Sequence, residues 1–261
     1  MSAGQLDAFG WRIAFLAGAI ILPFGLILRR NLPETHGTGA VVGEELFPAD
    51  GKISMPALVV LGLIILASGT TVSYVLDYMA TYSTETLHMA AYVGFVATMI
   101  TGASGLIFDL TSGLLSDRFG RKPVMMIPWA VLAVTTVPAF TIIARDRSVT
   151  AVILMVAVLS ISASVAQSAT LTSLTEGLPK KVRAGSLGLI YAFAISIFGG
   201  STQFTVAWLT KVLHSNLAPA WYMTAGVSIG LVTMLFLPET APLVHRIKPA
   251  SPDPAPDIVL V

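Results

Sequence analysis

Seven long apolar stretches restrict the fold of this chain more than any other feature of its sequence. A helix that crosses a bilayer needs about 20 mostly apolar residues. Charged residues make up only 11% of the 261 residues, whereas a soluble domain carries about 25%. In lipid a helix satisfies its own backbone hydrogen bonds and an open sheet edge cannot. The sequence therefore predicts an all-α integral membrane protein with seven transmembrane helices. The stretches are Trp11–Leu28, Met55–Tyr82, Tyr92–Leu115, Pro123–Ile143, Val149–Thr172, Leu187–Leu209 and Ala218–Leu237.

Lysine and arginine are divided unevenly between the two sets of connections that alternate along these stretches. The richer set holds 11 of the 15 and the poorer set holds 4. Because cytoplasmic loops retain Lys and Arg, this asymmetry predicts an N-terminus outside and a C-terminus in the cytoplasm. The richer set is Arg29, Arg30, Lys52, Arg118, Arg121, Lys122, Lys180, Lys181, Arg183, Arg246 and Lys248; the poorer set is Arg12, Arg145, Arg147 and Lys211.

The remaining composition narrows the functional classes. A formal net charge of +1 gives no broad basic surface for nucleic acid. The chain has no cysteine for a disulfide or a thiolate metal site, and its four histidines have no metal-ligand spacing. A P-loop for ATP is also absent. We therefore expect no enzyme, no metal, no cofactor and no nucleic-acid partner.

A tetrapeptide is repeated at two helix ends. Leu32-Pro33-Glu34-Thr35 follows the first stretch, and Leu237-Pro238-Glu239-Thr240 follows the last. Both copies come at the cytoplasmic end of their helix, and six spans separate them. This arrangement suggests a duplicated six-helix unit, of which the first copy contributes only its last helix.

The connection between the third and fourth stretches carries a charged motif, Gly113-Leu-Leu-Ser-Asp117-Arg118-Phe-Gly120-Arg121-Lys122. Gly113 allows two helices to approach closely. Asp117 can cap a helix or pair with a cation, and Gly120 permits a tight turn. The cations Arg118, Arg121 and Lys122 would together hold the loop in the cytoplasm. An ordinary positively charged loop is the alternative.

This motif resembles the G-x-L-[AS]-D-R-x-G-R-[KR] signature of the major facilitator superfamily. Glu176-Gly-Leu-Pro179-Lys-Lys-Val182-Arg183 resembles the E-x-x-P-x-x-V-R loop that follows the tenth helix in this superfamily. With the Trp11–Thr35 segment and Asp77-Tyr78-Met79…Thr86-Leu87-His88-Met89, the chain is similar to the metabolite:proton symporters, which carry citrate, dicarboxylates and osmolytes.

The resemblance implies a domain organisation. Residues 1–30 match the sixth helix of a twelve-helix transporter, 31–54 its cytoplasmic linker and 55–240 the C-terminal six-helix bundle. Residues 241–261 are a proline-rich tail that we expect to be disordered. Helices one to five of such a transporter have no counterpart in the sequence. The N-terminal half is thus an expected partner, beside the bilayer, protons and a small-molecule substrate.

The resemblance also implies proton symport of an organic acid such as citrate or a dicarboxylate, in a bacterial inner membrane. Substrate and proton would bind between two halves that rock to expose the site to either side. Asp117, Arg118, Arg121, Glu176 and Arg183 would form a cytoplasmic latch. However, the spans that match helices seven to twelve contain no mid-membrane Lys or Arg for a carboxylate substrate.

Polar residues inside the spans are candidates for the transport pathway. Asp77 and Asp109 are the clearest charges there, and each is either a proton-binding group or a structural partner. Thr70, Tyr74, Asp77 and Thr81 share one helix face, as do Thr98, Thr101, Gly105, Asp109 and Ser112. Such stripes either line a pathway or join helices. The remaining candidates are Tyr78, Gln167, Tyr191 and Gln203, and Tyr191 with Gly199–Gly200 also suggests packing or a bend.

Two other functions fit the topology. A seven-helix receptor or light-driven protein has the same orientation, but the last spans lack a lysine for a retinal Schiff base. A remnant of a split gene would insert into the membrane without transporting.

Overall fold

The computed structural model describes residues 11–19, 21–31, 54–179, 182–237 and 239–240. The chain divides into two units, Met1–Glu44 and Glu45–Val261, which are treated separately. In the first unit, the described part of the predicted Trp11–Leu28 stretch forms helices α2 (Trp11–Ala19) and α3 (Ile21–Asn31). The predicted tail, and the linker except for its two end residues, fall outside the described residues.

The second unit confirms the last six predicted spans. No strand occurs among the residues that the structure describes, and six helical segments are long and apolar enough to cross a membrane. Three are single α-helices of 26 to 29 residues and one is a shorter helix of 18. The other two combine α-helix with a π-helical segment. In chain order they are α4 (Met55–Asp77) with α5 (Met79–Thr81) and η2 (Tyr82–Thr86); α6 (Ala91–Phe119); α7 (Arg121–Asp146); α8 (Val149–Gly177); α9 (Arg183–Phe193) with η3 (Ala194–Gly199) and α10 (Gly200–Val212); and α11 (Ala218–Leu235).

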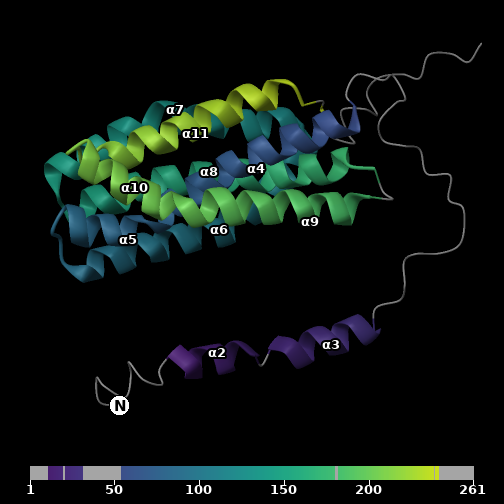
Figure 1. Cartoon of the computed structure of the whole chain (residues 1–261), viewed down its shortest axis with the longest axis horizontal. Helices are drawn as coiled ribbons and strands as arrows, with labels where there is room; N and C mark the ends of the chain where they lie inside the picture. Colours follow the sequence, from purple (N-terminus) through teal and green to yellow (C-terminus); the bar gives the residue numbers. More distant parts are fainter. Residues whose placement is uncertain (1–10, 20, 32–53, 180–181, 238, 241–261) are drawn as a thin grey trace, which may run out of the picture. The chain divides into compact units, whose positions relative to one another are not determined.

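Figure 1 shows these spans running alongside one another. Helix α8 packs along both α6 and α7, and α11 packs along α4 and α7. The core between them is built around large side chains such as Trp129 and Phe140. By contrast, α6 leaves Phe95, Met99 and Leu110 exposed. Apolar side chains on both the inside and the outside of the bundle are the pattern that lipid requires.

The two π-helical segments were not predicted. In η2 the N–H of Leu87 donates to the carbonyl of Tyr82, five residues earlier, at 3.1 Å. The segment η3 interrupts the Arg183–Val212 span at its middle, so that α9 and α10 are two helices on either side of it. Such segments are rare in helices and are frequent at functional sites.

The bundle has two chemically different ends. At the end where α6 meets α7, here called the motif end, charged side chains gather. At the opposite end, the buried Tyr82 hydroxyl donates to the carbonyl of Asn216 at 2.8 Å, and its ring packs edge-on against Phe140. This contact joins η2 to the connection between α10 and α11 and so fixes this end of the α4 span.

Candidate functional site

Arg121 is the centre of an ionic network at the motif end. Its side chain is 6% exposed. Nε donates to Glu176 Oε2 at 3.1 Å and Nη2 to Glu176 Oε1 at 2.8 Å, which is a bidentate pair. Nη2 also lies 2.5 Å from Asp117 Oδ1, and Nη1 donates to the Ser116 hydroxyl. The predicted residues Asp117, Arg121 and Glu176 are therefore brought together by α6, α7 and α8.

Helices α7 and α11 cap each other beside this network. The Glu239 carboxylate accepts the backbone N–H of Arg121 at 2.7 Å and that of Lys122 at 2.9 Å, so it closes the N-terminus of α7. In return, Lys122 Nζ donates to the carbonyls of Leu235 and Leu237, where α11 ends, at 2.8 and 3.1 Å. Both contacts place a charge where the helix dipole favours it.

Glu239 and Thr240 had not been assigned to the site from the sequence. Thr240 donates its hydroxyl to Glu176 Oε2 at 2.8 Å, which links the end of α11 to the Arg121 pair. The signal for both residues was the repeated Leu-Pro-Glu-Thr, which had been interpreted only as evidence of duplication. We use the name motif cluster for Ser116, Asp117, Arg121, Lys122, Glu176, Glu239 and Thr240.

The two motif glycines have different surroundings. Gly120 adopts φ +102°, and a methyl group built on it would lie 3.0 Å from the Glu239 carboxylate. The α6–α7 turn therefore requires glycine there, as predicted. A methyl group at Gly113 would meet no atom within 4 Å. The close helix approach expected at Gly113 is thus not made among the described residues, because its side of α6 faces outward.

Two of the predicted latch cations lie outside the motif cluster. Arg118 is exposed, with its guanidinium 5.6 Å from the centre of the Phe119 ring. Arg183 donates from Nε to the Leu178 carbonyl at 3.0 Å and so closes the connection between α8 and α9. Only Arg121 and Lys122 of the predicted cations hold the cluster itself.

A second group of polar side chains crosses three neighbouring helices within the spans, α4, α6 and α8. The Tyr74 ring of α4 lies against η3, since a methyl group at Gly199 would be 2.8 Å from Tyr74 Cε2. The Gln167 amide of α8 lies directly over Gly69 of α4. Both side chains are half-buried. Glycine on the facing helix therefore makes room for each predicted pathway residue.

Asp109 continues this group onto α6. A methyl group at Gly105 would lie 3.6 Å from Asp109 Oδ2 and 4.0 Å from Ser164 Oγ, so both oxygens flank the same glycine. Asp109 is exposed, and its backbone carbonyl accepts the Ser168 hydroxyl at 2.9 Å. We call Asp109, Ser164, Gln167 and Tyr74 the polar row; it runs across α6, α8 and α4, and its Tyr74 end packs against η3.

The other candidates lie apart from the polar row. Asp77 at the end of α4, Tyr191 on α9 and Gln203 on α10 are exposed. Tyr78 is 7% exposed and belongs to the apolar core. The Tyr78 ring is thus held in the bundle core, and a part for Tyr78 in the pathway stays a prediction.

Comparison with known proteins supports the membrane assignment and identifies the family. A family model described as Major Facilitator Superfamily matches residues 2–199 and 90–259. A citrate-proton symporter of Klebsiella pneumoniae is 29% identical over 91% of this chain and 54% of its own length. A glycine betaine/proline/ectoine/pipecolic acid transporter of Dickeya dadantii is 31% identical over 90% of this chain and 49% of its own length.

The chain spans about half the length of the curated relatives it matches. The family model covers more than half of the chain, and the relatives named are transporters. The chain is thus an integral membrane protein that belongs to the Major Facilitator Superfamily, a family of transporters and not of enzymes.

Proposed function

We propose that this chain forms one side of a proton-coupled pathway for a small metabolite, with the polar row facing the substrate. The polar row is the observation that carries this proposal. An aspartate, an amide and a tyrosine that remain partly exposed within membrane spans are costly in hydrocarbon, and such residues mark substrate or ion pathways. Glycines that hold Tyr74 and Gln167 in place give the row a fixed geometry.

The second side of the pathway would be a further six-helix unit, of the kind that major facilitator transporters pair with this one. Substrate would bind near mid-membrane between the two units, which would rock about it. The proposed orientation places the motif end in the cytoplasm of a bacterial inner membrane, since that end carries most of the Lys and Arg.

The motif cluster supports a refined version of the expected latch. Every guanidinium nitrogen of Arg121 has an acceptor inside the unit. Arg121 and Glu176 would therefore brace the α6–α7 turn and leave the contact with the other side of the transporter to exposed groups. Arg118 and the half-exposed Asp117 carboxylate are those groups. Arg183 would hold the neighbouring loop.

Asp109 is the proposed proton-coupling residue, with Asp77 as the second candidate. Asp109 belongs to the polar row, so its protonation would be sensed at the proposed substrate position. In membrane vesicles that contain the transporter, Asp109→Asn should abolish substrate accumulation driven by a pH gradient but retain exchange of labelled for unlabelled substrate. Glu85→Gln, an exposed carboxylate in η2, is the matched control. Equal gradient-driven accumulation by Asp109→Asn and Glu85→Gln would remove Asp109 from coupling.

Two substrate classes remain in competition. The citrate-proton symporter relative favours an organic acid. The described spans, however, place Lys and Arg only at their ends, and the polar row offers a tyrosine ring and an amide. Those groups suit a zwitterion or a quaternary ammonium compound, which an aromatic face attracts. The betaine and proline transporter relative is consistent with this second class.

The deciding experiment is uptake by the protein expressed from its gene, read in frame upstream of the Met1 codon to include any coding sequence there. Vesicles would receive an inward proton gradient and labelled citrate, succinate, proline or glycine betaine. Accumulation that collapses with a protonophore would support proton symport, and the accumulated compound would identify the class. Absence of accumulation and of exchange for all four compounds would contradict the proposal and favour a non-transporting remnant.

A further inference from the structure

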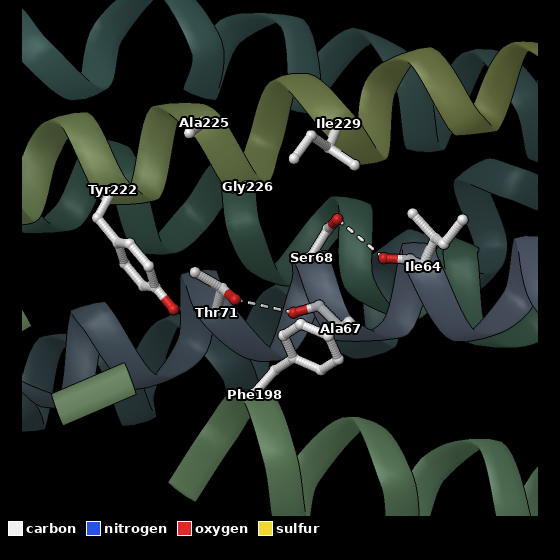
Figure 2. Close-up of a pocket in the computed structure, with 9 residues that line it drawn as sticks. All are labelled: Ile64, Ala67, Ser68, Thr71, Phe198, Tyr222, Ala225, Gly226 and Ile229. Atoms are coloured by element: carbon white, nitrogen blue, oxygen red, sulfur yellow. Dashed lines mark hydrogen bonds between the residues drawn. The ribbon is translucent and has the colours of Figure 1, made fainter. Parts of the chain in front are cut away.

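A pocket of about 370 Å³ lies between α4, α11 and η3. Its volume is at the lower end of the range of about 300–1,000 Å³ that is usual for small-molecule sites. Figure 2 shows the side chains of Tyr222 and Ile229 approaching from α11, those of Ser68 and Thr71 from α4, and Phe198 closing the third side. None of these residues belongs to the polar row or to the motif cluster.

Apart from the Tyr222 hydroxyl at one end, the pocket offers an occupant almost only carbon. The hydroxyls of Ser68 and Thr71 donate to the carbonyls of Ile64 and Ala67 in their own helix, at 2.8 and 3.0 Å, as the dashed lines in Figure 2 show. Neither proton is therefore available to a ligand. A hydrated metabolite would lose its water there without replacement, and water itself needs two to four polar partners. The chemistry selects a hydrocarbon.

The pocket is separate from the proposed pathway. At about 100° per residue, Ser68 on the pocket side and Tyr74 of the polar row lie about 120° apart around α4. Ser68 is buried beneath Gly230 of α11, whereas Tyr74 lies against Gly199 of η3. Helix α4 thus presents two different environments, and a molecule in the pocket would not compete with a substrate at the polar row.

The surface around the pocket is apolar and exposed. Beside it, α11 exposes Trp221 and Val232 at 59% and 56%, and η3 exposes Ile197 at 52%; Ile229, which lines the pocket, is itself 57% exposed. Trp221 and Tyr222 lie in the first turn of α11, at the level where such residues anchor helices to the membrane interface. From Tyr222 to Ile229 the pocket follows α11 for about 10 Å, at 1.5 Å per residue.

The pocket cannot be closed by moving α11 inward. A methyl group at Gly226 would lie 3.2 Å from Thr71 Cγ2, and one at Gly230 would lie 2.9 Å from Ser68 Cβ and in contact with Trp129. The two helices already touch along this Gly226-x-x-x-Gly230 seam. An empty space beside a seam in full contact leaves its lining without dispersion partners, so an occupant has to come from outside.

We propose that this pocket binds one acyl chain of a bilayer lipid, which enters beside Tyr222 and lies between α4 and α11 as far as Ile229. The proposal rests on the membrane location of the three helices and is independent of the transported substrate. Phe198, which the chain would touch, directly precedes Gly199, the residue against which Tyr74 packs. A bound lipid would therefore contact η3 at the residue next to the one that packs against the polar row.

The test uses the full chain in vesicles of phosphatidylethanolamine and phosphatidylglycerol that contain a small fraction of phospholipid with a photoactivatable mid-chain diazirine. After illumination, labelled residues are mapped by mass spectrometry. We expect the pocket residues Thr71 and Gly226 to be labelled at least as strongly as the exposed Val232 on the same helix. Labelling confined to exposed residues such as Val232 would overturn the proposal.

A variant that fills the pocket provides the second arm. Ala225→Phe should reduce labelling of Thr71 and Gly226 at least fivefold relative to Val232. Ala103→Phe, on the exposed face of α6, should leave that ratio unchanged. If Ala225→Phe fails to fold, as judged by its helix content and melting temperature, Ala225→Leu takes its place. Pocket labelling that persists in the folded filled variant would contradict a specific lipid site.

Discussion

Two arginines of one motif have opposite surroundings, although they are only three positions apart. Arg121 is enclosed by Glu176, Asp117 and Ser116, while Arg118 lies exposed over a neighbouring ring. The planar guanidinium of Arg121 binds both carboxylate oxygens of Glu176, which a lysine ammonium cannot reproduce. The two positions therefore form a matched pair for substitution.

We expect Arg121→Lys to lower the free energy of unfolding by about 2 kcal/mol or more, because hydrogen bonds to charged groups contribute about 1.5–3 kcal/mol each. Arg118→Lys should leave it unchanged, since an exposed cation contributes little. Thermal unfolding of both variants in the same detergent measures the difference. Equal melting temperatures for the two variants would show that the bidentate Arg121–Glu176 pair adds no stability.

The glycines of the same motif provide a second comparison. Gly120→Ala forces a side chain into φ +102° and towards the Glu239 carboxylate, a strain of about 1–3 kcal/mol. Gly113→Ala adds a methyl group in open space within a helix, where alanine is favoured by up to about 1 kcal/mol. We expect opposite shifts of the melting temperature. A stabilised Gly120→Ala variant would disprove the required turn.

At the scale of elements, the Arg183–Val212 span is made of α9, η3 and α10. Its adjacent glycines Gly199 and Gly200 differ in their surroundings, as Gly120 and Gly113 do. A methyl group at Gly199 would press on the Tyr74 ring and on Thr70, whereas one at Gly200 meets nothing within 4 Å. The two positions have the same residue type and nearly the same place in the helix. Any difference between their variants therefore reports the contact between η3 and α4.

Gly199→Ala is expected to destabilise the protein by about 1–3 kcal/mol, the usual cost of an overpacked contact, and to slow uptake by the full transporter. Gly200→Ala should have neither effect. In a Tyr74→Ala background, the Gly199→Ala substitution should cost much less stability than it does in the unchanged protein, because the ring that it presses on is gone. Additive losses in this double-mutant cycle would mean that the two residues are not coupled.

The positions of the helices were largely predictable from the sequence, whereas the contacts between helices were not. Apolar length located the last six spans because lipid imposes that length on any helix. The π segments escaped prediction, since a helical wheel assumes 3.6 residues per turn throughout. Tyr74 and Tyr78 differ by one turn and look alike in sequence; only the folded bundle shows that Tyr74 is half-buried and Tyr78 is buried in the core. Glu239 required knowledge of which helix N-terminus lies beside the end of α11.

At the scale of the whole molecule, the motif cluster and the polar row lie in different parts of the six-helix unit. The cluster joins helix ends at the motif end, and the polar row lies within the spans. A change in the cluster should therefore alter how the unit switches between conformations more than how it holds a substrate. This separation is testable in the complete transporter.

We expect Asp117→Asn to lower the maximal rate of uptake at least tenfold while the KM changes less than about twofold, because in the proposed mechanism Asp117 would help the motif end to close and lies apart from the polar row. Asp146→Asn, an exposed aspartate at the opposite end of α7, is the control. Initial rates over a range of substrate concentrations separate the two parameters. A raised KM with an unchanged maximal rate would assign Asp117 to substrate binding instead.

The reciprocal caps between α7 and α11 also have a consequence for biosynthesis. Glu239 and Thr240 follow the last of the six spans, yet they complete the N-terminus of α7 and the environment of Glu176. During translation, α7 enters the membrane three spans before its cap has been made. A nascent chain arrested before α11 would thus keep an uncapped helix and a lysine without its carbonyl partners at the membrane surface. Membrane proteases could recognise these unpaired groups in an incomplete chain, and synthesis of the last span would cover them.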